Sequence, residues 1–201
     1  RTELGESVVV MGLGLLGSFA LQCARLSGAV PLLGIDGAES RRRLAIQVGA
    51  AAVFHHETPD LAAKIIDLTR GGAQAVLEVT GNPEAIKQGL GFMAPQGRIA
   101  LVGCSRTPTT DLDFYHLVHR PGISIIGAHN FVRPARDTYP GHWTMRADMA
   151  MLLRLFTARR IQVKPYITEI VAPEQAPAVF QALAQDGASP TIGTIFRWSP
   201  E

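Results

Sequence analysis

Three glycines near the start of the chain have the spacing of a phosphate-binding turn. Gly12, Gly14 and Gly17 form a Gly-x-Gly-x-x-Gly motif that follows the β-branched run at residues 7–11. We expect Gly12 to permit the tight turn out of a strand and Gly14 to let a pyrophosphate approach bare backbone. We expect Gly17 to let the following helix pack close to the sheet. The motif therefore predicts binding of a dinucleotide at the N-terminus of a helix.

An acidic residue stands where such a site would need it. Asp36 follows Gly17 by 19 residues and ends the next apolar run. A carboxylate there accepts hydrogen bonds from the ribose hydroxyls of the adenosine and repels a 2′-phosphate, which favours NAD over NADP. The amides of Leu15 and Leu16 begin the helix, so their N–H groups and the positive end of the helix dipole face the phosphates. The arginines at 41–43 weaken the preference for NAD, because arginine can accommodate a 2′-phosphate.

The elements that must position these residues follow a regular alternation of strand and helix. Strands are predicted at residues 7–11, 30–35, 51–54, 75–79, 98–102 and 123–126, and helices at 15–27, 40–48, 60–69 and from Pro83 onward. Strands that are apolar throughout suit a parallel sheet covered on both faces. The sequence thus predicts an α/β Rossmann fold with a doubly wound parallel sheet of six strands in the order 3-2-1-4-5-6.

The alternation changes after residue 128. A polar, aromatic and proline-containing loop is expected at 130–143. A helix at 147–158, a strand at 166–171, a helix at 173–185 and a strand at 192–198 are predicted to follow. We therefore expect a Rossmann domain at residues 1–145 and a helix–strand–helix–strand tail at residues 146–201.

Length and composition narrow the function classes. The 201 residues, 47 % hydrophobic and 18 % charged, are too apolar for disorder and suffice for one domain with an appendage. No apolar run reaches about 18 residues, so no membrane span is expected. The net charge of +2 indicates neither nucleic acid nor membrane as a partner. The two cysteines, Cys23 and Cys104, make neither a disulfide framework nor a metal site, which predicts a reducing, cytoplasmic compartment.

Several motifs together resemble one known family. They are GESVVVMGLGLLG at 5–17, GID at 34–36 before an arginine-rich helix ending at Gly49, LEVTG at 77–81, GRIALVG at 97–103 and IIGAHN at 125–130. Their order resembles the cofactor half of the medium-chain, zinc-dependent alcohol dehydrogenases, with the sorbitol and threonine dehydrogenase-like branch the most similar. The resemblance implies hydride transfer between an alcohol or polyol and a nicotinamide cofactor, NAD rather than NADP.

The resemblance also implies the contacts of that cofactor. It places Gly12, Gly14, Leu15, Leu16 and Gly17 at the pyrophosphate, Asp36 and Arg41 at the adenosine, Val79 and Thr80 along the cofactor, Val102, Gly103 and Cys104 near the nicotinamide, and Ala128, His129 and Asn130 near its carboxamide. No catalytic residue and no metal ligand is expected within this chain.

One large part of the family pattern has no counterpart here. The GroES-like catalytic domain that precedes the cofactor domain, with its catalytic and structural zinc ligands, is missing. The resemblance therefore implies a fragment that is inactive alone, with zinc only in the missing domain. It implies that the tail packs on that domain. It also implies that strand 123–126 pairs edge to edge in a homodimer or homotetramer.

Two other function classes share part of the pattern. A regulatory domain that senses NAD would use the same glycine turn and acid, although it has no need of the tail. A methyltransferase that uses adenosylmethionine also has a glycine-rich first turn and an acid after the second strand. Its turn usually lacks the third glycine, and its sheet ends in a reversed strand.

Four further features have both a functional and an ordinary interpretation. His116 and His119 have metal-ligand spacing, with Asp113 nearby, but no third ligand of a recognised pattern, so a solvated helix end is expected. Cys104 has no visible base and is expected to be a packed residue rather than a nucleophile. The pair at 55–56 is expected in a loop near the adenine. The aromatic loop containing Tyr139, His142 and Trp143 either touches a substrate or a neighbouring subunit, or is pinned to the surface by one aromatic ring.

Overall fold

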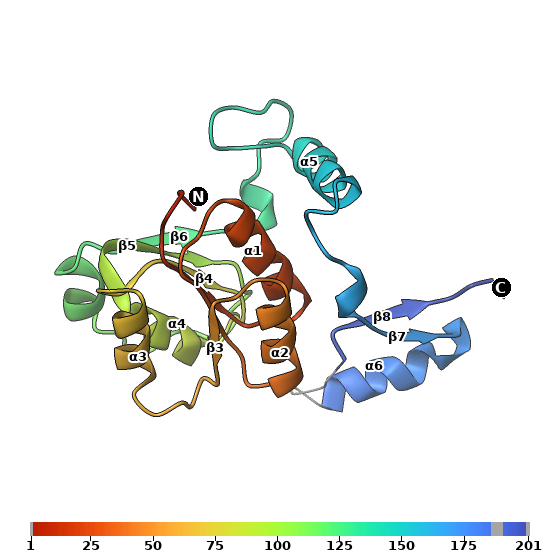
Figure 1. Cartoon of the computed structure of the whole chain (residues 1–201), viewed down its shortest axis with the longest axis horizontal. Coiled ribbons are helices and arrows are strands. Elements are labelled where there is room, and N and C mark those ends of the chain that lie inside the picture. Colours follow the sequence, from red (N-terminus) through yellow and green to blue (C-terminus); the bar gives the residue numbers. More distant parts are fainter. Residues whose placement is uncertain (1, 186–190, 200–201) are drawn as a thin grey trace.

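The computed structural model of the chain describes residues 2–185 and 191–199. Its main elements are β1 (Val8–Met11), α1 (Leu15–Leu26), β2 (Leu32–Ile35), α2 (Glu39–Gln47), β3 (Ala52–Phe54), α3 (Leu61–Leu68), β4 (Ala73–Glu78), α4 (Pro83–Leu90), β5 (Met93–Leu101), β6 (Ser124–Gly127), α5 (Met145–Thr157), β7 (Ile167–Val171), α6 (Ala176–Gln185) and β8 (Gly193–Phe196) (Figure 1). The tail predicted at 146–201 extends over residues 186–190, 200 and 201, which lie outside the described residues, as does Arg1.

Six parallel strands form the main sheet in the order β3-β2-β1-β4-β5-β6. This confirms the predicted Rossmann topology. Val8 of β1 lies opposite Leu32 of β2 and Ala75 of β4, so the first strand is central. Because the strands are parallel, the carboxyl ends of β1, β2 and β4 lie at one edge of the sheet. The strand order reverses beside β1, and doubly wound folds bind ligands in the crevice at such a point.

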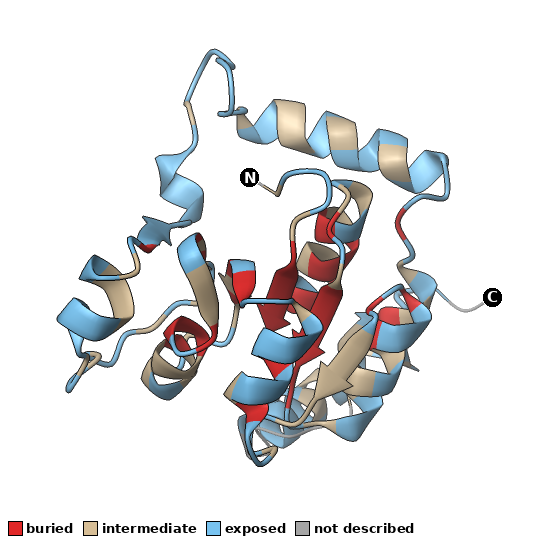
Figure 2. Ribbon diagram, turned by 60° about the vertical axis from the view of Figure 1, so that its left-hand side comes forward, coloured by how far each residue is buried: buried red, intermediate tan, exposed pale blue. Residues whose placement is uncertain are grey.

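The two faces of the sheet are covered by different helices. Val9 and Met11 belong to a core cluster shared with α3 and α4, whereas Val8 and Val10 belong to one shared with α1 and α2. Every residue of β1 and β2 is buried, which explains why these strands are apolar throughout. Figure 2 shows this buried centre as the red strands between the helices.

Most predicted boundaries differ from the structure by one to five residues, and two of these differences have clear local reasons. Strand β5 begins at Met93 rather than at residue 98, because the pairing with β4 shifts register and so accommodates Pro95 and Gly97. Helix α5 begins at Met145 rather than at 147, because the Thr144 hydroxyl accepts a hydrogen bond from the Ala147 N–H at 3.2 Å.

The loops contain short structure that the sequence did not predict. One π-helical turn spans Tyr115–His119, and a 3-10 turn spans Asn130–Val132 within the predicted loop. The rest of that loop is held by a bridge between Tyr139 and His142, whose rings stack with centroids 4.7 Å apart.

The tail has the predicted helix–strand–helix–strand order, and β7 pairs with β8 in parallel. The segment before β7 packs against α1. The side chain of Gln22 donates to the Gln162 carbonyl at 3.0 Å and accepts from the Gln162 N–H at 2.8 Å. Tyr166 is fully buried, and its ring lies 5.6 Å from that of Phe19. By contrast, α5 has no buried residue and lies apart from the sheet, across the top of Figure 2.

None of the helices in the described ranges is long and apolar enough to span a membrane.

Candidate cofactor-binding site

A cleft of about 720 Å³ opens at the carboxyl ends of β1, β2 and β4. It is lined by Met11, Gly12, Gly14, Leu15, Leu16, Gly17, Ile35, Asp36, Gly37, Ala38, Arg41, His56, Val79, Thr80, Asn82, Glu84, Ala85 and Gln88. The structure therefore brings together the glycine turn, the acid, Arg41 and the two residues predicted after the fourth strand. Its volume falls within the range of small-molecule sites, roughly 300–1,000 Å³.

Each glycine of the turn meets a different physical constraint. Gly12 has φ +87°, and a Cβ there would lie 2.8 Å from the Thr80 side chain. A Cβ on Gly17 would lie 1.7 Å from the Gly12 carbonyl oxygen, so helix α1 could not pack as it does. A Cβ on Gly14 would meet no atom within 4 Å and would point into open space. Gly12 and Gly17 serve the fold, while Gly14 leaves room beside the cleft.

The N-terminus of α1 borders this cleft. Gly14 is the N-cap, and the Ser18 N–H donates to the Gly14 carbonyl at 2.8 Å as the first full helical hydrogen bond. The N–H groups of the preceding first turn have no partner within the helix, as at any helix start. They and the helix dipole make this end favourable for an anion.

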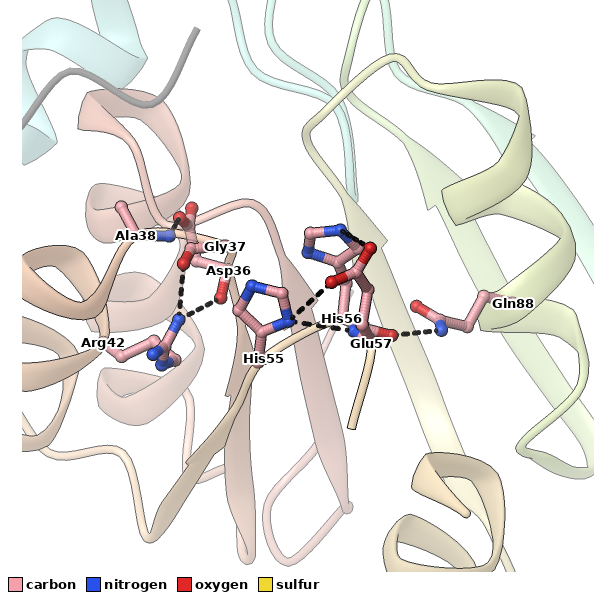
Figure 3. Close-up of polar contacts among 8 residues, drawn as sticks. All are labelled: Asp36, Gly37, Ala38, Arg42, His55, His56, Glu57 and Gln88. Carbon is pink, nitrogen blue, oxygen red and sulfur yellow. Dashed lines mark hydrogen bonds and ion pairs between the residues drawn. The ribbon is translucent and has the colours of Figure 1, made fainter. Parts of the chain in front are cut away.

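Asp36 is held by the backbone around it. One carboxylate oxygen accepts from the Leu13 N–H at 2.7 Å, and the other accepts from the Ala38 N–H at 2.7 Å. The Arg41 guanidinium lies 3.9 Å from the carboxylate. Arg42 donates to the carbonyl oxygens of Asp36 and Gly37, each at 2.7 Å (Figure 3). These contacts fix the β2–α2 turn and join it to the glycine turn.

Glu78 organises the opposite wall, and sequence reasoning missed it. This side chain is fully buried at the end of β4. One carboxylate oxygen accepts from the Thr80 N–H at 2.7 Å and from the Gly81 N–H at 3.1 Å, and the Thr80 hydroxyl also donates to it. The signal was present as a single acid at the end of an otherwise apolar strand.

Helix α4 supplies part of the lining, which was also not predicted. Asn82 caps this helix by accepting from the Glu84 N–H at 2.9 Å, and both residues line the cleft. Gln88 reaches across to the loop after β3, where its side chain donates to the His56 carbonyl at 2.8 Å. Helix α4 and the loop after β3 are separated in the sequence and meet only in the folded chain, so no local sequence pattern could indicate this contact.

The six residues predicted for the nicotinamide end do not line this cleft. Val102, Gly103 and Cys104 follow β5, and Ala128, His129 and Asn130 follow β6. Gly103 and Cys104 instead pack against the loop after β4, since a Cβ on Gly81 would lie 2.8 Å from the Cys104 carbonyl carbon. The His129 ring accepts from the Phe131 N–H at 3.2 Å. The cofactor role of these six residues stays a prediction.

The histidines at 116 and 119 and both cysteines lie outside the lining of this cleft. The His116 ring lies 2.7 Å from the Asp113 carboxylate, and hydrogen bonds from His116 lower the pKa of Asp113. Within the described ranges, one group of three His, Cys, Asp or Glu side chains has its ligand atoms close together, namely His55, His56 and Glu57. His119 therefore joins no such group. Cys104 is exposed, so the expectation of a packed residue was wrong, because this cysteine follows the end of β5 in a surface loop. Burial raises the pKa of the Cys23 thiol.

A family model for zinc-binding dehydrogenases matches residues 16–147, from the glycine turn to the first residues of α5. The chain belongs to the zinc-binding dehydrogenase family. This confirms the family resemblance inferred from the motifs.

Curated relatives and solved structures agree with this assignment. L-threonine 3-dehydrogenase of Pyrococcus horikoshii is 36 % identical over 124 residues, which are 61 % of this chain and 35 % of that protein. L-threonine 3-dehydrogenase of Bacillus licheniformis is 31 % identical over 180 residues, which are 89 % of this chain and 48 % of that protein. The crystal structure of benzyl alcohol dehydrogenase from Acinetobacter calcoaceticus superposes with a TM-score of 0.82 at 26 % identity and covers 99 % of this chain and 51 % of that one. This chain thus spans about half the length of these relatives, or less.

Proposed function

We propose that this zinc-binding dehydrogenase chain is the NAD(H)-binding half of an enzyme that transfers hydride between an alcohol or polyol and the nicotinamide. The observation that carries the proposal is Gly14, whose missing side chain leaves open space at the N-terminus of α1, within the same cleft as Asp36. A pyrophosphate fits a bare helix N-terminus, and an adenosine ribose fits the adjacent carboxylate.

The residues that line the cleft suit the adenosine and pyrophosphate parts of a dinucleotide. The first turn of α1 would hold the pyrophosphate, and Asp36 with Arg41 would hold the adenosine. Val79 and Thr80 would lie along the cofactor, with the turn of Thr80 kept in place by Glu78. When bound, the cofactor supplies the hydride chemistry, and these residues supply its position.

A catalytic zinc ion does not fit the described part of this chain. Its one cluster of three possible ligands, at residues 55–57, follows β3, whereas the nicotinamide is predicted beside β5. Three strands separate β3 from β5 in the sheet. We therefore assign the catalytic zinc, the alcohol-binding pocket and the turnover of substrate to the rest of the full-length protein.

Asp36 supports a preference for NAD over NADP. Its carboxylate is 7 % exposed and lies at the rim where the ribose 2′-hydroxyl would sit, so a 2′-phosphate would meet a buried negative charge. Arg41 lies close enough to pair with Asp36 and thereby offsets part of that repulsion. We expect NADH to bind at least about tenfold more tightly than NADPH, which corresponds to about 1.4 kcal/mol.

Fluorescence titration of the chain with NADH, NADPH and adenosylmethionine tests this proposal. Gly14→Ala should weaken NADH binding strongly while leaving the thermal melt unchanged, because the added methyl group enters space that the fold does not use. Asp36→Ala should erode the preference for NADH over NADPH. Asp67→Ala, which removes an exposed carboxylate from α3 outside the cleft, should change neither property.

The outcomes separate the competing functions. Equal NADH binding by the wild type and Gly14→Ala would overturn the proposed site. Binding of adenosylmethionine in place of NADH would favour a methyltransferase. A melt without a cooperative transition would mean that the titrated sample is unfolded, and the titration would then be repeated on the full-length protein.

We also propose that β6 pairs with the same strand of a second copy. This strand is the outer edge of the sheet, and all four of its residues are exposed, including Ile125 and Ile126. An uncovered edge carries unpaired N–H and C=O groups that a second strand can satisfy.

A further inference from the structure

The loop after β3 gathers three side chains with the chemistry of metal ligands. His55, His56 and Glu57 each offer a ligand atom, and these atoms lie within 4.8 Å of one another. The His55 Nδ1 lies 3.8 Å from one Glu57 carboxylate oxygen, and the His56 Nε2 lies 4.0 Å from the other. Figure 3 shows both rings turned toward the carboxylate.

These separations are close to those of a coordinated ion. With metal–ligand bonds of about 2.0–2.1 Å, two ligands of a tetrahedral zinc ion stand roughly 3.4 Å apart. Shifts of up to about 0.7 Å in each side chain, together with rotation of the two rings, would close the set, and these side chains are 37 %, 55 % and 76 % exposed. The ion would replace the 3.1 Å hydrogen bond that the Glu57 N–H donates to the His55 ring.

The backbone under the cluster is anchored on both sides. The His55 carbonyl accepts from the Thr58 N–H at 3.0 Å, and the His56 carbonyl accepts from the Gln88 side chain at 2.8 Å. The two rings stack with centroids 4.4 Å apart, and the His56 ring lies against Gly37, where an added Cβ would be 3.2 Å from it. The anchored backbone reduces the conformational entropy that is lost when an ion binds, while the rings turn out of their stack to reach it.

The donor set indicates the class of ion. Two imidazoles and one carboxylate suit Zn²⁺, Co²⁺ and Ni²⁺ rather than Mg²⁺ or Ca²⁺, which prefer oxygen ligands. The exposure of the cluster leaves further coordination positions to water. We propose that His55, His56 and Glu57 form a binding site for one divalent transition-metal ion beside the cleft, separate from any zinc used in catalysis.

Calorimetric titration of the untagged 201-residue chain with Zn²⁺ tests this site, together with Co²⁺ titration followed by visible absorption. We expect one saturable ion per chain, a Co²⁺ spectrum typical of nitrogen and oxygen ligands, and a Zn²⁺-dependent rise in the melting temperature. His55→Ala, His56→Ala and Glu57→Gln should each weaken binding at least about tenfold, since even indirect changes at metal sites cost that much.

His116→Ala is the matched control, because it removes a histidine that pairs with a carboxylate elsewhere on the surface. It should leave the titration unchanged. The proposal fails if the chain shows no saturable binding, or if His116→Ala weakens binding as much as the three ligand variants. It also fails if the ligand variants fold normally in a thermal melt and bind Zn²⁺ as the wild type does.

Discussion

At the scale of single residues, the glycine turn shows that one motif contains positions of different kinds. Gly12 and Gly17 are constrained by the backbone itself, through a positive φ and a contact that leaves no room for a methyl group. A side chain at Gly14 would meet no atom of the chain within 4 Å, so the proposed ligand is what would constrain that position. The spacing of the motif is therefore partly a folding signal and partly a binding signal, and substitutions separate the two.

Gly17→Ala should destabilise the chain itself. Its methyl group would lie 1.7 Å from the Gly12 carbonyl oxygen, which is backbone and cannot rotate away. We expect a loss of at least about 2 kcal/mol in the free energy of unfolding, typical of overpacking against a rigid neighbour. A denaturant melt measures this. Gly14→Ala is the control in the same turn, and equal stability of the two variants would contradict the argument.

Glu78→Gln should loosen the wall formed by the loop after β4. The amide replaces one acceptor oxygen by a donor and weakens the bonds from Thr80 and Gly81. We expect a loss of about 1–3 kcal/mol in stability and weaker NADH binding. Glu84→Gln, an exposed change on α4, should have little effect on the thermal melt. A Glu78→Gln protein as stable as the wild type would show that this carboxylate does not organise the wall.

At the scale of elements, the sheet was predictable because its signals are local. The apolar runs of β1 and β2 give strands on sequence grounds alone, and the glycine turn with Asp36 gives the start of the cleft. The predicted start of β5 was wrong, because pairing with β4 extends the strand through Pro95, a residue that locally disfavours a strand. The lining from α4 could not be predicted, because the contact of Gln88 with the loop after β3 joins residues 32 positions apart.

The ion pair between Glu6 and Arg98 should make stability depend on pH. Two hydrogen bonds at 2.7 and 2.5 Å connect the start of β1 to β5, and the guanidinium lowers the pKa of the Glu6 carboxyl. A lowered pKa means that the stabilisation is fully present above the ordinary carboxyl pKa, about 4.3, and is lost as pH falls below it. Glu6→Gln should therefore lower the melting temperature by about 2–4 °C at pH 7, equivalent to about 1 kcal/mol.

The difference between Glu6→Gln and the wild type should shrink below pH 4, when the wild-type carboxyl takes up its proton. Thermal melts of both proteins from pH 3 to pH 8 measure it. A difference that stays constant over this range would mean that the charge of Glu6 does not stabilise the fold.

At the scale of the whole molecule, the tail and the β6 edge of the sheet both expose apolar side chains. The tail exposes Met149, Leu153 and Phe156 on α5 and Trp198 after β8, and β6 exposes its edge. Surfaces of this kind mark contacts with other parts of a protein or with a second copy. The family resemblance predicts that the rest of the dehydrogenase packs on the tail and that a second subunit pairs with β6.

Ile125→Pro should break the proposed pairing of β6 without breaking the sheet. The Ala128 N–H donates to the Leu101 carbonyl of β5, so the alternation of a strand turns the N–H of residue 125 toward the outer edge. Removing that outward donor should convert dimers to monomers in light scattering coupled to size exclusion. Ile125→Val is the control. A wild-type chain that is monomeric at high micromolar concentration would contradict edge pairing by this chain.

Helix α1 has two attachments, one at its N-terminal cleft and one halfway along, where Gln22 exchanges hydrogen bonds with Gln162. A ligand at the first end and the tail at the second therefore restrain the same rigid body. The two attachments are therefore expected to be thermodynamically coupled, because each one reduces the opening motions that would release the other. The Gln162 amide should accordingly exchange its proton with solvent more slowly when NADH is bound. If the cofactor binds as proposed, its effect would thus reach the base of the tail without any change of shape.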